Sequence, residues 1–428
     1  MKTKLLFSIL VVAQLNVLAS PQPDKGFVAH EWGTFTSVQG ADGIQLEWNP
    51  LVVSELPDFV YDRNRSTDGS RARRFADFSS KSAFICRQRM ETPVIYFYSE
   101  QPREVDVSVQ FPQGLVTEWY PQLSPLQNTK ENPTFAQNHG IRWSNIQIVP
   151  MSETKEGDAV LPVDKSGSHY YSARETDANM VRIRTVSTHK FENEKFLFYR
   201  GIGNFQAPLQ VTMSGNEDQV SLMNNGTDSL ANLYVLQIQK GMGKFSQIKK
   251  LAPGASAAAR LFPGKGLMPI SELQEQISAE MAAALAGQGL YPAEAKAMVN
   301  TWRDSWFGED GTRVLYILPR SWTDQVLPLN IEPKPRDILR VMVGRAEVLP
   351  PSKEWQLLKQ IVRFTDPDTD VQQKAVAEAR ELGFGRFAEP AVRHLSGKIP
   401  GREFGQVSWA FLEATKPSKE LGKSLAIK

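Results

Sequence analysis

Three glutamates in aromatic, otherwise apolar surroundings are the residues of this sequence best suited to acid–base chemistry. Glu31 lies in HEW, Glu91 in RMETPV and Glu118 in TEWYP. Apolar surroundings disfavour an ionised carboxylate, so we expect the pKa of each glutamate to rise toward the range of a general acid. Two such carboxyl groups about 5–10 Å apart would suit glycoside hydrolysis. The neighbouring Trp32 and Trp119 could stack on the faces of sugars.

A structural reading of the same residues stays open. In that reading Glu91 pairs with Arg87 or Arg89, and the two tryptophans fill the core, because structural ion pairs perturb pKa values as well. If the residues form a site, the candidate catalytic residues are Glu31, Glu91 and Glu118. The candidate ligand-binding residues are then His30, Trp32, Arg89, Trp119 and Tyr120.

The sequence contains no pattern typical of a metal or cofactor site. Its five histidines are widely separated, and no two stand four residues apart. Cys86 is the only cysteine, which excludes a cysteine-based zinc site and an intramolecular disulfide. The HExxH, GxSxG, Walker A and dinucleotide-binding motifs are absent. We therefore predict no metal and no cofactor. For His30 the alternative to a ligand role is a half-buried histidine bonded to a backbone carbonyl.

A basic stretch from Tyr61 to Arg89 contains eight arginine or lysine residues against three aspartates. Its guanidinium groups could bind an anionic ligand, such as an acidic glycan or a phosphate, through forked contacts. The alternative is a solvated surface loop, since most charge runs only solvate a surface. The turn residues of Ser66–Ser70 favour the loop.

The N-terminus indicates an exported protein. Lys2 and Lys4 precede an apolar run, Leu5–Ala13, that is shorter than the roughly 20 residues needed to span a bilayer. Residues 1–19 are therefore predicted to be a signal peptide cleaved ahead of Ser20. The formal net charge of +2 falls to 0 without the two lysines, which argues against nucleic-acid binding. We expect a soluble protein, periplasmic or extracellular, with no membrane span.

The stretch Phe27–Val38 alternates as a β-strand. On such a strand His30 and Glu31 point to opposite faces. Gly33 could host a bulge that re-aims one of them. Without that change the two side chains cannot act on the same atom.

Many short alternating runs, ended by turn residues, predict an antiparallel β-sandwich region over residues 20–265. Its clearest part, Thr92–Phe111, has the pattern of an antiparallel hairpin. Residues 266–350 are predicted to form a helical hairpin plus strands, with helices beginning at Ser271 and Pro292. Residues 351–416 are predicted to be helical, and residues 417–428 a polar tail. The predicted fold class is thus a multidomain α+β protein.

Two resemblances add to this reading. Segment 366–396 resembles a single HEAT-type helical pair, a unit that normally needs about three copies to stand alone. Five motifs resemble a group of exported bacterial proteins to which no activity is assigned. This resemblance implies export and a shared architecture. The motifs are HEWGTFTSVQG at 30–40, RMETPVIYFYS at 89–99, TEWYP at 117–121, KAMVNTWRDSWF at 296–307 and RVMVGR at 340–345.

Two functions remain under consideration. The first is an exported binding or interaction protein with a small-molecule, glycan or protein ligand, suggested by β-sandwich patterning without a catalytic motif. The second is a glycan-directed hydrolase that uses two of the three glutamates. The second requires those carboxyl groups to meet in one open cleft within roughly 10 Å.

Overall fold

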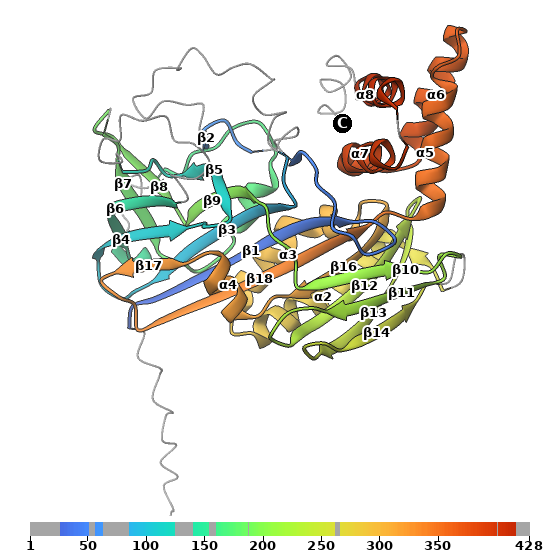
Figure 1. Ribbon diagram of the computed structural model, residues 1–428. Coiled ribbons are helices and arrows are strands. Elements are labelled where there is room, and N and C mark those ends of the chain that lie inside the picture. The colour runs from blue at the N-terminus through green and yellow to red at the C-terminus, as the bar shows by residue number, and fades with distance from the viewer. Residues whose placement is uncertain are drawn as a thin grey trace, which may run out of the picture.

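The computed structural model describes residues 26–50, 56–62, 85–124, 140–153, 160–186, 188–261, 266–399 and 401–416. Over these residues the fold is mixed α+β, with a large central sheet and a helical C-terminal part (Figure 1). Ten described strands form the main sheet. In sheet order they are β15 (Met268–Pro269), β13 (Met242–Leu251), β12 (Leu230–Gln239), β16 (Gly311–Ile317), β18 (Asp337–Val348), β1 (Val28–Gln39), β3 (Gln88–Tyr98), β9 (Leu197–Gly203), β5 (Gly114–Tyr120) and β2 (Tyr61–Asp62).

The central pair of the main sheet is parallel. β1 pairs with β18 from Val28 opposite Asp337 to Gln39 opposite Val348. The other pairings in the main sheet are antiparallel. Strands within residues 20–265 pair with one another only in the antiparallel sense, as expected. The parallel neighbour of β1 comes from outside that region, and alternation along a strand does not encode the direction of such a neighbour. The sheet also joins strands from both sides of residue 265.

Two smaller sheets pack against one face of the main sheet. The three-stranded sheet has the order β10 (Leu209–Met213), β11 (Gln219–Asn224), β14 (Ser256–Arg260). The five-stranded sheet has the order β17 (Leu329–Glu332), β4 (Arg103–Gln110), β6 (Gly140–Val149), β7 (Met180–Arg184), β8 (Phe191–Glu194). A shared apolar core joins all three sheets. We call the face of the main sheet that the two smaller sheets cover the sheet-covered face. β3 and β4 belong to different sheets, so the predicted hairpin over Thr92–Phe111 does not form.

Helices cover the opposite face, the helix-covered face. They are η3 (His169–Arg174), α2 (Ile270–Gly287) and α3 (Pro292–Phe307), and α3 packs on both of the others. The helical hairpin expected from the sequence is present, with its first helix beginning one residue before Ser271. Trp302 and Trp306 of α3 are buried in the second apolar core, which fills the space between helices and sheet.

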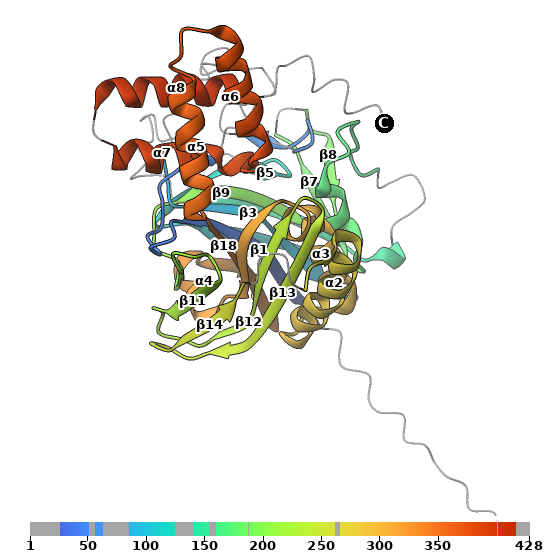
Figure 2. The ribbon, with the colours of Figure 1, turned by 90° about the vertical axis from the view of Figure 1, so that its right-hand side faces the viewer.

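Four helices stand at one end of the main sheet (Figures 1 and 2): α5 (Pro351–Arg363), α6 (Thr369–Glu381), α7 (Ala388–Lys398) and α8 (Arg402–Thr415). A third apolar core ties them to Val38 of β1 and to Trp48. α5 packs mainly on α6, and α7 on α8. The pairing therefore differs from the single pair predicted over 366–396, which would have joined α6 to α7.

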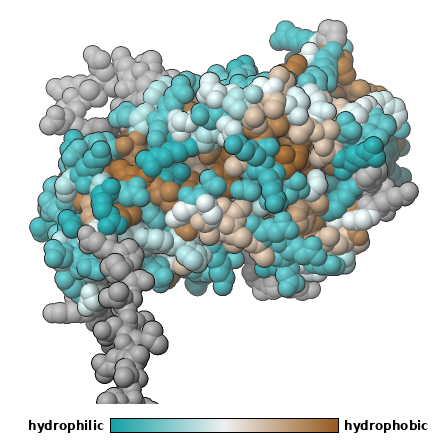
Figure 3. Space-filling view, turned by 90° about the horizontal axis from the view of Figure 1, so that it is seen from below, coloured by the Kyte–Doolittle hydropathy of each residue, from teal (hydrophilic) through white to brown (hydrophobic). Residues whose placement is uncertain are grey.

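The surface seen from below is mainly hydrophilic, with hydrophobic side chains gathered between the polar ones (Figure 3). Among the described helices, none combines the length and the apolar character needed to cross a membrane.

Candidate functional site

The HEWGTF and RMETPV motifs touch each other in the main sheet. The register between β1 and β3 shifts between Trp32 and Thr34, where Thr92 and Pro93 of β3 together lie opposite Gly33. The bulge is therefore in β3 and not at Gly33 as the sequence suggested, and β1 keeps its register with β18 through Gly33. A side chain at Gly33 would place its Cβ 2.8 Å from the Cα of Pro93. Thr92 has φ 43°, an unusual value for a β-branched residue. Strained backbone of this kind is often held where a protein positions functional groups.

Replacing Gly33 by alanine is expected to destabilise the protein by roughly 1–3 kcal/mol, because the new methyl group would press on backbone atoms of β3. Urea unfolding followed by tryptophan fluorescence measures the change. Gly215→Ala is the matched control, since a Cβ there meets nothing within 4 Å. Equal stability of the two variants would show that the close approach of β1 and β3 is unimportant.

The bulge does not bring His30 and Glu31 to one side. Glu31 faces the sheet-covered core, where its carboxylate accepts hydrogen bonds from Tyr199 Oη at 2.5 Å and Arg340 Nε at 2.6 Å. His30 faces α3 on the opposite side, with Nδ1 2.8 Å from Glu294 Oε2. The prediction that these neighbours point apart is therefore confirmed, and they do not share a site.

His30 belongs to a buried cluster at the start of α3. The carboxylate of Glu294 also accepts hydrogen bonds from Tyr98 Oη and from the backbone N–H of Tyr291, each at 2.8 Å. The partner of His30 is thus a side chain 264 residues away. The alternative of a bond to a backbone carbonyl is therefore wrong. This cluster fastens the first turn of α3 to β1 and β3.

The other two candidate acids, Glu91 and Glu118, lie on the helix-covered face among arginines. Their strand neighbours Met90 and Trp119 point into the opposite core. We call this group the arginine band. It consists of Arg89, Arg200, Arg313, Arg345 and Arg386 with Glu91, Glu118, Glu309 and Glu347.

Glu91 is the centre of the arginine band. Its carboxylate accepts hydrogen bonds from Arg386 Nη1 at 2.9 and 3.1 Å and from Thr36 Oγ1 at 2.6 Å, and Arg89 Nε lies 3.7 Å away. Arg386, from the short η4 turn Gly385–Phe387, also donates to Ser305 of α3. The band therefore joins β3, α3 and the C-terminal helices.

The charge environment reverses the expected pKa shifts. Burial alone would raise the pKa of Glu91, but Arg386 and Arg89 outweigh it and hold the pKa well below 4.5. Glu118 is likewise buried, and its ion pair with Arg200 at 2.8 Å lowers its pKa. The prediction of raised pKa values is therefore wrong for these two residues, because arginines distant in sequence determine the sign.

The aromatic candidates do not form one platform. β3 and β9 separate β1 from β5, so the HEW and TEWYP strands are not neighbours. Trp32 is fully buried on the helix-covered face, whereas Trp119 lies in the core of the sheet-covered face. Tyr120 packs near Tyr61 with ring centroids 6.3 Å apart. The core-filling alternative therefore describes both tryptophans.

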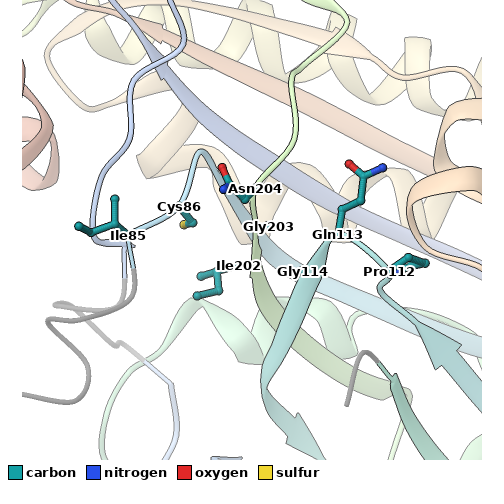
Figure 4. A pocket seen from close by; sticks show the side chains of 8 residues that line it. All are labelled: Ile85, Cys86, Pro112, Gln113, Gly114, Ile202, Gly203 and Asn204. Carbon is teal, nitrogen blue, oxygen red and sulfur yellow. The ribbon is translucent and has the colours of Figure 1, made fainter. Parts of the chain in front are cut away.

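A pocket of about 480 Å³ lies next to the arginine band. Ile85, Cys86 and Ile202 line one side and Pro112 and Gln113 the other (Figure 4). Ile202 of β9 pairs directly with Arg89 of β3, so the pocket adjoins the band. Burial raises the pKa of the Cys86 thiol to about 12, so the thiol stays protonated and its Sγ–H donates to the Gln88 carbonyl.

Several members of the band carried no sequence signal. Arg200 lies in a plain strand, and Arg386 follows two glycines in the segment taken as HEAT-like. Of the basic stretch, residues 63–84 lie outside the described residues, which leaves Arg87 and Arg89. Among the described residues no group of three histidine, cysteine or acidic side chains is arranged to hold a metal ion.

No protein-family model matches the chain, and no curated protein matches it. Among solved structures, similarity was found to the yeast delta-COP-I mu-homology domain, alone and complexed with a Dsl1 WxWxV peptide. Each comparison covers 77% of this chain and 100% of that chain, with 8% sequence identity and a TM-score of 0.29. A TM-score of this size carries no argument about fold or function.

Proposed function

We propose that this chain is an exported binding protein, periplasmic or extracellular, which takes a small-molecule ligand in the pocket beside Arg89. The observation that carries the proposal is the position of the pocket. Its volume of about 480 Å³ is within the range of small-molecule sites. Its floor adjoins a buried arginine, and such a group can fix the orientation of a ligand.

The three glutamates favour binding over hydrolysis. Each is at least nine-tenths buried and lies in an ion pair with an arginine. A general acid must hold a proton near the working pH, and the arginines keep Glu91 and Glu118 ionised. We therefore rank a glycan-directed hydrolase using these residues below a binding protein.

Export is part of the proposal and rests on the sequence. Lys2 and Lys4 precede a short apolar run and a plausible cleavage site ahead of Ser20. N-terminal sequencing of the protein recovered outside the cytoplasm tests this point. Recovery of the uncleaved chain in the cytoplasm alone would contradict it.

A thermal-shift screen of small molecules and oligosaccharides, followed by calorimetry of the hits, tests the binding site. Asn204→Trp should fill the mouth of the pocket from an exposed position and weaken binding at least tenfold. Met223→Trp is the control, since Met223 is 42% exposed on the three-stranded sheet. Unchanged affinity in Asn204→Trp, or a screen without any hit, would contradict the proposed function.

A further inference from the structure

Buried hydrogen-bond donors without partners lie in and beside the arginine band. Thr34 is 1% exposed, and its hydroxyl makes no hydrogen bond within the described part of the chain. The same is true, among described residues, of Arg386 Nε, which lies 3.8 Å from Glu309. Buried polar atoms nearly always have a partner, so atoms of this kind require an explanation.

Thr34 and Arg386, which carry two of the unpartnered donors, both lie next to Glu91. Thr34 of β1 is the cross-strand partner of Glu91 in β3. Arg386 binds the carboxylate of Glu91 and reaches Ser305 of α3. The indole Nε1 of Trp306, the next residue of α3, is also buried and without a partner among the described residues. All three atoms donate, so the partner that fits them is an acceptor.

The charge of the arginine band indicates what kind of acceptor fits. Its nine members comprise five arginines and four glutamates, which leaves one positive charge in excess. Burial and the neighbouring Arg200 and Arg386 lower the pKa of Arg89 to about 10 despite the opposite effect of Glu91. Arg89 is thus held near two other arginines, and Arg313 near Arg345. An anion placed among them would relieve that repulsion.

We propose that the arginine band holds an oxyanion group, a carboxylate, phosphate or sulfate, with the Thr34 hydroxyl and Arg386 Nε among its donors. This inference rests on the proposed function, for it names the charged part of a ligand whose body occupies the adjacent pocket. The carboxylate of Glu91 does not prevent binding, because Arg386, Arg89 and Thr36 already neutralise and hydrogen-bond it. Guanidinium and hydroxyl groups are common partners of oxyanions in proteins.

The experiment measures the thermal midpoint of the full mature chain in phosphate, sulfate or acetate, against sodium chloride at equal ionic strength. We expect a saturable rise beyond that in chloride. Thr34→Val keeps the side-chain shape but removes the donor, and should weaken the apparent affinity at least tenfold. It should also leave the anion-free protein at least as stable, since it removes a buried unpartnered hydroxyl.

Thr176→Val is the matched control. Thr176 is also buried with an unpartnered hydroxyl among the described residues, and it lies after η3, away from the arginine band. Its response to oxyanions should equal that of the wild type. A wild-type response no larger than that in chloride would overturn the inference, and so would equal responses of the two variants. Equal responses of the two variants would mean that the anion binds elsewhere, and that a water molecule is the partner of the Thr34 hydroxyl.

The two proposals fail in different ways. If oxyanions have no effect but a neutral ligand from the screen binds and Asn204→Trp abolishes its binding, the proposed function stands and only the oxyanion assignment is lost. If oxyanions have no effect and no ligand responds to the pocket variant, both proposals are wrong.

Discussion

Arg340→Met is expected to destabilise the protein by about 3–5 kcal/mol, since it leaves the carboxylate of Glu31 buried without its cation. The side chains of Arg340 and Glu31 are 1% and 0% exposed, and their closest atoms lie 2.6 Å apart. They join the parallel strands β1 and β18 at the centre of the main sheet. Urea denaturation at neutral pH gives the free energy of unfolding.

Two further variants test the reason for this loss. Arg142→Met removes an exposed partner of Asp106 and should change the stability by only about 0–1 kcal/mol. The double variant Glu31→Gln, Arg340→Met should be more stable than Arg340→Met alone, because no charge is then buried alone. If the free energy of unfolding of Arg340→Met lay within about 1 kcal/mol of the wild-type value, water would have to reach Glu31.

Arg386→Gln is expected to have a similarly large effect, about 3–5 kcal/mol at neutral pH. The guanidinium of Arg386 holds Glu91 from the C-terminal helical part, and its side chain is only 17% exposed. Without it, Glu91 keeps Thr36 and the more distant Arg89 as partners. The contact between the main sheet and the four C-terminal helices should therefore weaken. Limited proteolysis measures this, because cleavage after residue 350 should be faster in the variant than in the wild type.

The effect of Arg386→Gln should depend on pH. The pKa of Glu91 is lower in the folded state than its ordinary value of 4.5. Its contribution to stability is therefore fully present above pH 4.5, and it is lost progressively as the pH falls from 4.5 toward the lower pKa of the folded state. The difference between wild type and variant should be largest above about pH 5 and should narrow toward about pH 3.

Arg363→Gln is the control for this measurement. Arg363 and Glu378 form an ion pair with side chains 37% and 50% exposed, so solvent screens it and its loss should change the stability little at any pH. A difference between wild type and Arg386→Gln that stayed constant from pH 3 to pH 7 would contradict the role assigned to Glu91.

Local pattern was sufficient for the individual elements. The alternation of Phe27–Val38 placed His30 and Glu31 on opposite faces, and the structure agrees. Gly33 marks the place where the register of β1 with β3 shifts, although the extra residue lies in β3 and not in β1. Pro292 was identified as the first residue of a helix and begins α3. These features depend on residues a few positions apart, which a sequence displays directly.

The neighbours of each element depended on the whole chain. β3 and β4 look like a hairpin because both alternate, yet β4 pairs with β6 and β17 in another sheet. Nothing in β1 indicates that its parallel neighbour begins at Asp337. Likewise, the helices of 351–416 were expected, but the sequence did not show that α5 pairs with α6 and α7 with α8, because several partners could cover each apolar stripe.

The sequence by itself determined which side chains share a face, where the strands and helices lie, and that three glutamates occur in apolar surroundings. Only the tertiary structure decided whether those glutamates are candidate general acids or members of buried ion pairs. Arg386 and Arg340 are 295 and 309 residues away from Glu91 and Glu31, and their charges decide that the acids are held in ion pairs. The physical reason is that burial raises the pKa of a carboxyl group while a nearby cation lowers it. Distance through space, which the order of residues does not reveal, settles which effect is larger.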